Sequence, residues 1–397
     1  MLRNRMNLVG LSEEIHYLCP YRNMETTHKI HTGAAQNMSA ISDSSVELVV
    51  TSPPYPMIEM WDEIMSKQNP KIATGLKEKA PDIVFELMHR ELDKVWSEVA
   101  RVLIPGGIVC VNIGDATRTL DGNFALYSNH SRIINYFTNH GFVNLPNIIW
   151  RKQTNAPNKF MGSGMLPAGA YVTLEHEWIL IFRKGGKREF KNATDKQKRR
   201  ESSFFWEERN VWFSDLWDNI KGTKQKIAAE SRDRSAAYPL EIPYRLINMY
   251  SLQGDTVLDP FLGTGTTTIA AIMSNRNSIG YEIDDKFADV IIDNIQSSSI
   301  DQMNEFIKSR IEAHKTFIAE RQQNNKEIKH FNEHLQLPVI TSQETDMQFV
   351  YLSEILGDSN CITAQYSNNT QTILNIKIGS RKRMNPTPKG AQIALTF

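Results

Sequence analysis

Residues 46–55, VELVVTSPPY, place a hydroxyl group, two prolines and an aromatic ring directly after an apolar run. A loop that only reverses the chain more often uses Gly, Asn or Asp. Pro53 and Pro54 fix φ at two successive residues and remove two backbone N–H donors, so the loop is stiff and its carbonyl oxygens are free to accept hydrogen bonds. We therefore expect this loop to hold acceptor groups still for a ligand.

A second segment with chemical potential is 256–267, TVLDPFLGTGTT, in which an expected strand ends in Asp259. It lacks the Gly-Lys-Ser/Thr of a phosphate loop and the third glycine of the dinucleotide fingerprint. Asp259 suits an ammonium group, the glycines allow a ligand to lie close to the backbone, and the following helix N-terminus favours a carboxylate. The segment therefore predicts a ligand with an amino-acid end.

Glu282 ends the next expected strand, 17 residues after Gly265. An acidic residue at the end of the second strand of such a unit commonly binds ribose hydroxyls. An amino-acid end together with a ribose describes S-adenosylmethionine, which we expect as the cofactor.

The elements that must position these loops alternate between short apolar runs and segments of helical periodicity, which favours an α/β fold with a mostly parallel sheet. The expected strands are 28–32, 47–51, 108–112, 147–150, 178–182, 256–258 and 278–281. The expected helices are 81–103, 131–140, 240–250, 266–275 and 284–297.

Three segments depart from this alternation. Residues 56–80 are irregular and carry Trp61, which suggests a lid; beyond 298 a long helix leads to a β-like stretch at 372–378. The third segment is residues 185–235, which are basic; Trp206, Trp212 and Trp217 within it are expected to be packing residues. The predicted division is a catalytic domain formed by 1–184 and 236–298, a basic insertion at 185–235, and an appendage at 299–397 whose default role is packing.

Composition limits the class of protein. Of the 397 residues, 41% are hydrophobic and 23% are charged, as in ordinary soluble domains. No window approaches 18 uncharged apolar residues, and the first residues lack a signal-peptide core, so we expect a cytoplasmic protein of a bacterium or archaeon with no membrane partner. Cys19, Cys110 and Cys361 are too scattered for a zinc cluster, and no metal is expected.

Charge is unevenly distributed although the formal net charge is zero. Residues 183–200 contain nine Lys or Arg against two acidic residues, Glu189 and Asp195. Such a concentration in a neutral chain is typical of a surface that faces phosphates.

Taken together, these motifs resemble one family, the amino-group DNA methyltransferases in which the catalytic motif precedes the cofactor motif (the β arrangement). The resemblance covers about 28–297. Its markers are TSPPY at 51–55, PGG at 105–107, WRK at 150–152, HEWILIF at 176–182 and the loop at 259–267. The Ser52 form is similar to the cytosine-N4 members, whereas Asp is commoner among adenine-N6 members.

The resemblance implies a Rossmann-like fold with circularly permuted motifs, in which Ser52 Oγ and the Pro53 carbonyl accept hydrogen bonds from the target amine and Tyr55 stacks on the base. The implied catalytic residues are Ser52, Pro53, Pro54 and Tyr55. The implied S-adenosyl-L-methionine residues are Thr51, Tyr238, Pro239, Asp259, Pro260, Phe261, Gly263, Gly265, Thr266, Thr267 and Glu282.

The family also implies double-stranded DNA as substrate, with the nucleotide flipped out of the duplex. The insertion would be the target-recognition region, with phosphate contacts from Lys184, Lys187, Arg188, Lys191, Lys198, Arg199 and Arg200. A cognate restriction endonuclease is the expected functional partner, and a homodimer is possible.

Two positions differ from the family pattern: Arg234 stands where His is usual, and Gly33-Ala34-Ala35 stands where an acid is common. The alternatives are adenine N6 as the target and, from another class, a DNA-binding relative without activity. An RNA or small-molecule methyltransferase is disfavoured by the basic insertion.

Overall fold

The computed structural model describes residues 25–152, 161–221, 238–358 and 361–367. The strands are β1 (Glu25–Thr32), β2 (Val46–Thr51), β3 (Leu103–Ile113), β4 (Ala116–Leu120), β5 (Asn123–Tyr127), β6 (Phe142–Asn144), β7 (Ile148–Arg151), β8 (Met161–Gly162), β9 (Ala170–Tyr171), β10 (His176–Lys184), β11 (Leu216–Trp217), β12 (Thr256–Asp259), β13 (Asn277–Glu282), β14 (His330–Asn332), β15 (Leu337–Val339), β16 (Tyr351–Asp358) and β17 (Cys361–Ser367).

The helices are η1 (Glu59–Trp61), α1 (Asp62–Gln68), α2 (Pro70–Lys77), α3 (Pro81–Val102), α4 (Asn129–Asn139), α5 (Ala193–Glu201), α6 (Trp206–Trp212), α7 (Glu241–Tyr250), α8 (Thr266–Met273), α9 (Lys286–Ser297) and α10 (Ile300–Gln323). Every strand expected between 28 and 281 is present, and the expected helices begin and end within a few residues of the observed ones.

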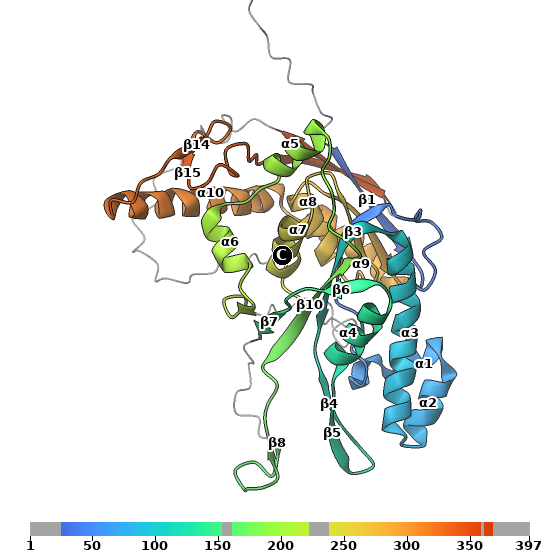
Figure 1. Cartoon of the computed structure of the whole chain (residues 1–397). Helices are drawn as coiled ribbons and strands as arrows, with labels where there is room; N and C mark the ends of the chain where they lie inside the picture. The colour runs from blue at the N-terminus through green and yellow to red at the C-terminus, as the bar shows by residue number, and fades with distance from the viewer. Residues whose placement is uncertain (1–24, 153–160, 222–237, 359–360, 368–397) are drawn as a thin grey trace, which may run out of the picture.

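One large sheet organises the molecule, with strand order β11-β7-β10-β3-β2-β12-β13-β1-β17-β16 (Figure 1). The central pairs from β3 to β1 are all parallel. Antiparallel pairing occurs where β10 meets β3 and β7, and where β17 meets β1 and β16. The sheet is therefore mostly parallel, as the alternation of elements predicts.

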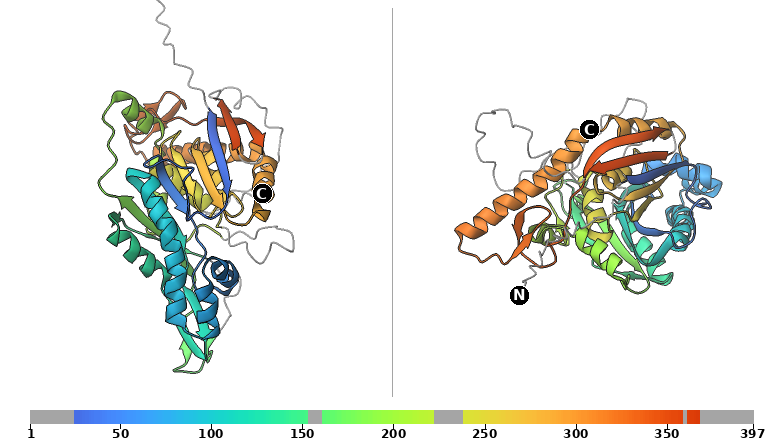
Figure 2. Two further views of the ribbon diagram at one scale, coloured as in Figure 1. Left: turned by 90° about the vertical axis from the view of Figure 1, so that its right-hand side faces the viewer. Right: turned by 90° about the horizontal axis from the view of Figure 1, so that it is seen from above.

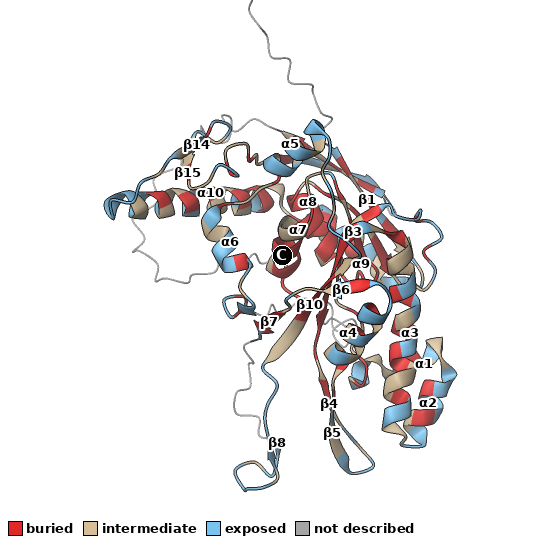
Figure 3. Cartoon of the chain, in the orientation of Figure 1, coloured by how far each residue is buried: buried red, intermediate tan, exposed pale blue. Residues whose placement is uncertain are grey.

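Helices cover both faces of the sheet (Figure 2). One hydrophobic cluster joins the sheet to α7, α8, α9 and the start of α10, and a second joins its other face to α1–α4. The strands of the central sheet are the most deeply buried part of the chain (Figure 3). Strands covered on both faces become almost continuously apolar, which explains runs such as that of β2.

Helix α3 shows how local sequence sets these elements. Pro81 occupies its first turn, where the missing N–H is not needed, and Arg101 lies in its last turn. The helix ends at Val102, and β3 begins at once. The PGG segment at 105–107, expected to separate helix from strand, therefore lies inside β3.

The C-terminal segment packs against this core. Strand β17 pairs antiparallel with β1, and β16 continues the sheet beyond it. The β-like stretch expected at 372–378 lies outside the described residues. In the described ranges no helix is both long enough and apolar enough to cross a membrane.

We call the side of the sheet where the central parallel strands end its carboxyl edge, and the side where they begin its amino edge. Different segments of the chain emerge from each. Strands β2, β12 and β13 end at the carboxyl edge, from which the β4–β5 hairpin also projects (lower part of Figure 1). Strand β10 runs the opposite way, so the segment after it, with α5, lies at the amino edge (top of Figure 1).

Candidate functional site

Three strand ends meet at the carboxyl edge. Strand β12 is the parallel neighbour of both β2 and β13. Thr51, Asp259 and Glu282, the last residues of β2, β12 and β13, therefore lie side by side. The sheet thus brings the two loops singled out in the sequence to one place. Ligands of open parallel sheets generally bind there, outside the carboxyl ends of the strands.

Asp259 braces this edge. Its Oδ1 accepts hydrogen bonds from Thr51 Oγ1 at 2.6 Å and Phe261 N at 3.0 Å, and its Oδ2 accepts from Thr267 Oγ1 at 2.5 Å. The residue is only 2% exposed. Burial raises the pKa of Asp259 to about 6, although these three hydrogen bonds oppose the rise. One carboxylate therefore links the loop after β2 to the start of α8.

The cofactor turn depends on its glycines and on Glu282. Gly265, the N-cap of α8, has φ +87°, a left-handed conformation that glycine adopts without strain. Glu282 accepts hydrogen bonds from the backbone N–H of Gly263 at 2.9 Å and of Asp284 at 3.0 Å. Burial raises the pKa of the Glu282 carboxyl. Since a carboxylate offers about four acceptor positions, two remain for ligand hydroxyls.

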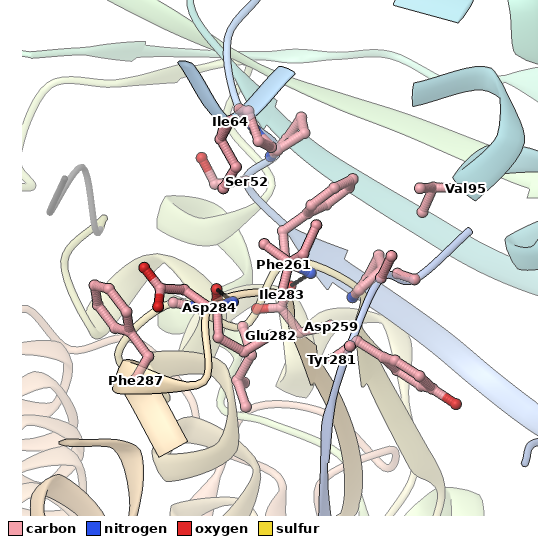
Figure 4. Close-up of a pocket in the computed structure, with 18 of the residues that line it drawn as sticks. Ser52, Ile64, Val95, Asp259, Phe261, Tyr281, Glu282, Ile283, Asp284 and Phe287 are labelled. Atoms are coloured by element: carbon pink, nitrogen blue, oxygen red, sulfur yellow. Dashed lines mark hydrogen bonds between the residues drawn. The ribbon is translucent and has the colours of Figure 1, made fainter. Parts of the chain in front are cut away.

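A pocket opens between the two loops, with Ser52 and Ile64 on one side and Asp284 and Phe287 on the other (Figure 4). The expected site residues that line it are Ser52, Pro53, Pro54, Tyr238, Asp259, Pro260, Phe261, Gly263, Thr266, Thr267 and Glu282. Thr51, Tyr55, Pro239 and Gly265 adjoin these residues without lining the pocket. Arg234, which departs from the family pattern, lies outside the described residues.

The pocket also has lining residues that were not expected from the sequence. Trp61, Ile64 and Gln68 come from residues 56–80, which were expected to be irregular but form η1, α1 and α2. Phe287, together with Tyr281, Ile283 and Asp284, comes from the end of β13 and the start of α9. Residues 33–36, where the family acid is missing, line it as well. The signal for Phe287 was its position just after the acidic strand end.

A hydrogen-bond network holds the catalytic loop. Ser52 Oγ lies 3.2 Å from Tyr55 Oη, and Tyr55 donates to Glu177 Oε2 at 2.9 Å. The amide of Asn112 donates to Tyr55 Oη at 2.9 Å and to Glu177 Oε2 at 2.8 Å. Burial first, and then the charge of Glu177, raise the pKa of Tyr55 well above its usual value, so its hydroxyl stays neutral.

The surroundings of this network leave it little freedom. Lys152 Nζ contacts Glu177 Oε1 at 2.8 Å. A Cβ added at Gly114 would meet the Tyr55 ring at 2.9 Å, so the ring packs directly on this backbone. Asn129 donates to the carbonyls of Pro56 and Gly114 and thereby ties both sides together. Neither Asn112 nor Glu177 was assigned a role from the sequence.

The basic cluster lies away from this pocket. Residues 184–200, which the sequence predicts to face the phosphates of a substrate, follow β10 at the amino edge, at the opposite end of the strands from the pocket (Figure 1). Lys184 Nζ donates to the carbonyls of Ala100 and Leu103. Arg188 forms a two-bond ion pair with Asp255, the residue before β12.

Most other members of the cluster have protein partners as well. Lys198 contacts Asp255 at 3.4 Å, Arg200 pairs with Asp346, and Arg199 lies over the ring of Phe190. Lys191 pairs with Glu189 on the surface, and Lys187 is exposed. These contacts give most of the cluster roles in the protein's own packing, at a distance from the carboxyl edge.

Of the three tryptophans in the insertion, Trp212 and Trp217 are buried, as expected for packing residues. Trp206 is 36% exposed, although its ring stacks on Phe317 of α10. Strand β11 pairs parallel with β7, so the insertion, after passing the amino edge, returns toward the carboxyl edge.

Comparison with known proteins gives the family. The chain matches the DNA methylase family (N6_N4_Mtase) over residues 46–293. It is 52% identical to the Type II methyltransferase M.MthZI of Methanothermobacter thermautotrophicus, over 83% of this chain and 91% of that protein. It is 53% identical to the Type II methyltransferase M.MjaI of Methanocaldococcus jannaschii, over 69% of this chain and 92% of that protein.

A solved structure agrees with these matches. TTHA0409 of Thermus thermophilus, described as a putative DNA modification methylase in complex with S-adenosyl-L-methionine, is 31% identical, with a TM-score of 0.54 over 68% of this chain and 93% of that one. The pocket suits this cofactor, because Asp259 and Glu282 are acidic and Phe261, Ile283 and Phe287 are apolar. The cofactor of this protein is S-adenosyl-L-methionine, and the chain belongs to the family of amino-group DNA methyltransferases.

Proposed function

We propose that the protein transfers a methyl group from S-adenosyl-L-methionine to the exocyclic N4 of a flipped-out cytosine in a short sequence of double-stranded DNA. The observation that carries this proposal is that Ser52, Pro53 and Pro54 line the same pocket as Asp259 and Glu282. Acceptor groups for an amine and acidic groups for the cofactor thus face one space.

The catalytic loop supplies acceptors at fixed positions. An exocyclic amine is a weak nucleophile, because its lone pair is delocalised into the base. Acceptors at Ser52 Oγ and the Pro53 carbonyl stabilise the positive charge that develops on this nitrogen during attack. Pro53 and Pro54 restrict the backbone, and Asp259 holds Thr51, so the acceptors do not relax away.

The cofactor supplies an electrophilic methyl group when it is bound. Asp259, Glu282 and the glycine turn would hold it in the pocket that Ser52 lines. Orienting an amine and its reaction partner in this way is worth up to about 7–11 kcal/mol in well-aligned systems. Positioning and electrostatics therefore account for catalysis without a covalent intermediate on the protein.

The carboxyl edge is the face to which DNA would bind, because a flipped base must reach Ser52. The β4–β5 hairpin and the segment containing β8 and β9 both project from this edge (Figure 1). Their rings meet where Phe124 stacks on Tyr171, with centroids 4.5 Å apart. Strand β11 also runs toward this edge, and we assign target recognition to the segments that project from the edge, β4–β5 and β8–β9, in preference to residues 184–200.

Two features support the finer points of the proposal. A hydroxyl at position 52, where Asp is the commoner residue of adenine-specific members, favours cytosine. The names of M.MthZI and M.MjaI, both Type II methyltransferases, support a role in protecting host DNA from a cognate restriction endonuclease. A cytoplasmic location follows from that role.

The test is methylation of genomic DNA by the purified protein, followed by enzymatic hydrolysis and nucleoside chromatography. N4-methylcytosine is the expected product, and methylome sequencing of an expressing host gives the recognition sequence. A methyladenine peak alone would replace the cytosine assignment with the adenine alternative. Tight DNA binding without any methyl incorporation would establish the non-catalytic alternative.

A further inference from the structure

The network around Tyr55 has a direction. An amide nitrogen only donates, so Asn112 Nδ2 supplies protons to the oxygens of Tyr55 and Glu177 and, at 3.5 Å, to Ser52 Oγ. A carboxylate only accepts, so the Tyr55 proton points at Glu177 Oε2, 2.9 Å away. Tyr55 Oη is then left as an acceptor toward Ser52, 3.2 Å away.

This direction decides how Ser52 faces the pocket. The Ser52 hydroxyl proton is directed at Tyr55, and one lone pair of Oγ accepts from the Asn112 amide at 3.5 Å. A hydroxyl has two acceptor positions, so the other lone pair is available to the ligand that enters the pocket. A chain of oxygens from Ser52 through Tyr55 to Glu177 therefore presents an acceptor at one end and a negative charge at the other. The Glu177 side chain is 12% exposed, so the far end of this chain reaches water.

We propose that Glu177 orients Ser52 through Tyr55 and is the final acceptor of the proton that the methylated amine must release. This inference rests on the function proposed above and holds for either target base. It assigns to Glu177 a positioning and proton-accepting role through Tyr55 and Ser52, without contact with the base.

The step balances in atoms and charge. The N–CH₃ bond forms as the S–CH₃ bond breaks, the electron pair of that bond stays on sulfur, and the nitrogen becomes positively charged. Its surplus proton passes to Ser52 Oγ, while the Ser52 proton passes to Tyr55 and the Tyr55 proton passes to Glu177. The amine is then neutral, both hydroxyls keep one proton, and Glu177 is a carboxylic acid that returns its proton to water.

The surroundings agree with this assignment. The raised pKa of Tyr55 means that it relays a proton without remaining ionised. Lys152, the cation that contacts Glu177, balances the carboxylate before the reaction. Asp259 accepts its hydrogen bonds from Thr51, Thr267 and Phe261, so it lies outside the chain of oxygens from Ser52 to Glu177.

The test compares Glu177→Gln with Glu175→Gln. Glu175 lies two residues earlier, at the surface, where it pairs with Arg151. Single-turnover methyl transfer by Glu177→Gln should be at least about 100-fold slower, since general base assistance contributes about 10²–10⁴-fold. Affinities for the cofactor and for a DNA substrate should stay within about threefold, and Glu175→Gln should keep the wild-type rate.

A second variant separates proton acceptance from packing. Glu177→Ala should be equally slow, and added formate, a small carboxylate, should raise its rate by at least about tenfold without affecting Glu175→Gln. A rate for Glu177→Gln within threefold of wild type would overturn the proposal, as would loss of cofactor affinity in proportion to rate with no rescue by formate. Wild-type protein that methylates no DNA would instead contradict the proposed function itself.

Discussion

The two edges of the central sheet both gather charged and polar residues, yet they use them differently. At the amino edge, Asp255 is 3% exposed and forms ion pairs with Arg188 and Lys198, so its negative charge is balanced by cations of the protein itself. At the carboxyl edge, Asp259 is about as deeply buried but lines a pocket. Local charge density is therefore a poor guide to a ligand site, whereas charge beside a cavity is a good one.

Removing the Ser52 hydroxyl should give the largest effect. Ser52→Ala deletes the acceptor at the carboxyl edge, so methyl incorporation should fall by about 10²–10³-fold, the range seen for loss of one preorganised hydrogen-bonding group. Incorporation of labelled methyl groups measures the rate, and calorimetry measures cofactor affinity, which should stay near wild type. Loss of cofactor binding with rate unchanged per bound cofactor would assign Ser52 to the cofactor instead.

Breaking the ion pair at the amino edge should reduce stability and spare the chemistry. Arg188→Ala leaves the buried Asp255 with weaker partners, and we expect the free energy of unfolding to fall by about 2 kcal/mol. Urea unfolding measures this change. Methyl transfer at low temperature should remain near wild type, with Lys191→Ala, in a surface pair, as the matched control. A tenfold loss of DNA affinity at unchanged stability would restore the phosphate-binding interpretation.

Acidification should weaken cofactor binding at the carboxyl edge. The pKa of Asp259 is raised to about 6, so its carboxylate is mostly ionised at pH 7 and mostly protonated at pH 5. A positively charged ligand favours the ionised form, so the dissociation constant should rise by about tenfold from pH 7 to pH 5. Glu282, whose pKa is also raised, titrates in the same pocket.

Asp259→Asn is the control that separates the two acids. It should bind the cofactor more weakly at pH 7 and lose most of the pH dependence, as measured by calorimetry across this range. A pH dependence that persists unchanged in Asp259→Asn would assign the effect to Glu282.

The smallest effect is expected from the exposed part of the basic cluster. The double change Lys187→Ala and Lys191→Ala should alter the slope of log affinity for DNA against log salt concentration by less than about 0.9, the value of one phosphate contact. Fluorescence anisotropy at several salt concentrations gives the slope. A change in this slope equal to about two phosphate contacts would place DNA at the amino edge.

Sequence reasoning succeeded where the signal is local. The apolar run of β2 followed by Pro53 and Pro54 predicts a strand and a stiff loop without reference to distant residues. The strand–glycine–helix pattern around Asp259 does the same for the second loop. The two loops were expected to serve one reaction, and the parallel register of β2 with β12 brings them together. The end of α3 was placed one residue late, because β3 starts without a connecting loop.

Sequence reasoning is weakest where the direction of a strand decides which residues lie near the pocket. The basic cluster follows β10, and only the antiparallel pairing of β10 with β3 shows that it emerges at the amino edge. Asn112 and Glu177 lie 65 positions apart and meet through the same pairing of strands. Glu177 lies in the HEWILIF marker at 176–182, but that marker gave it no role, and no spacing rule could join either residue to Tyr55.

The hydrogen bond between Thr51 and Asp259 connects two binding events. Thr51 precedes Ser52, and Asp259 forms part of the cofactor pocket, so a cofactor that draws the Asp259 carboxylate into one arrangement also fixes the backbone that receives the base. Occupancy of either place then favours occupancy of the other, and thermodynamic reciprocity requires the same factor in both directions. DNA and cofactor should accordingly bind this enzyme cooperatively, through a single shared carboxylate.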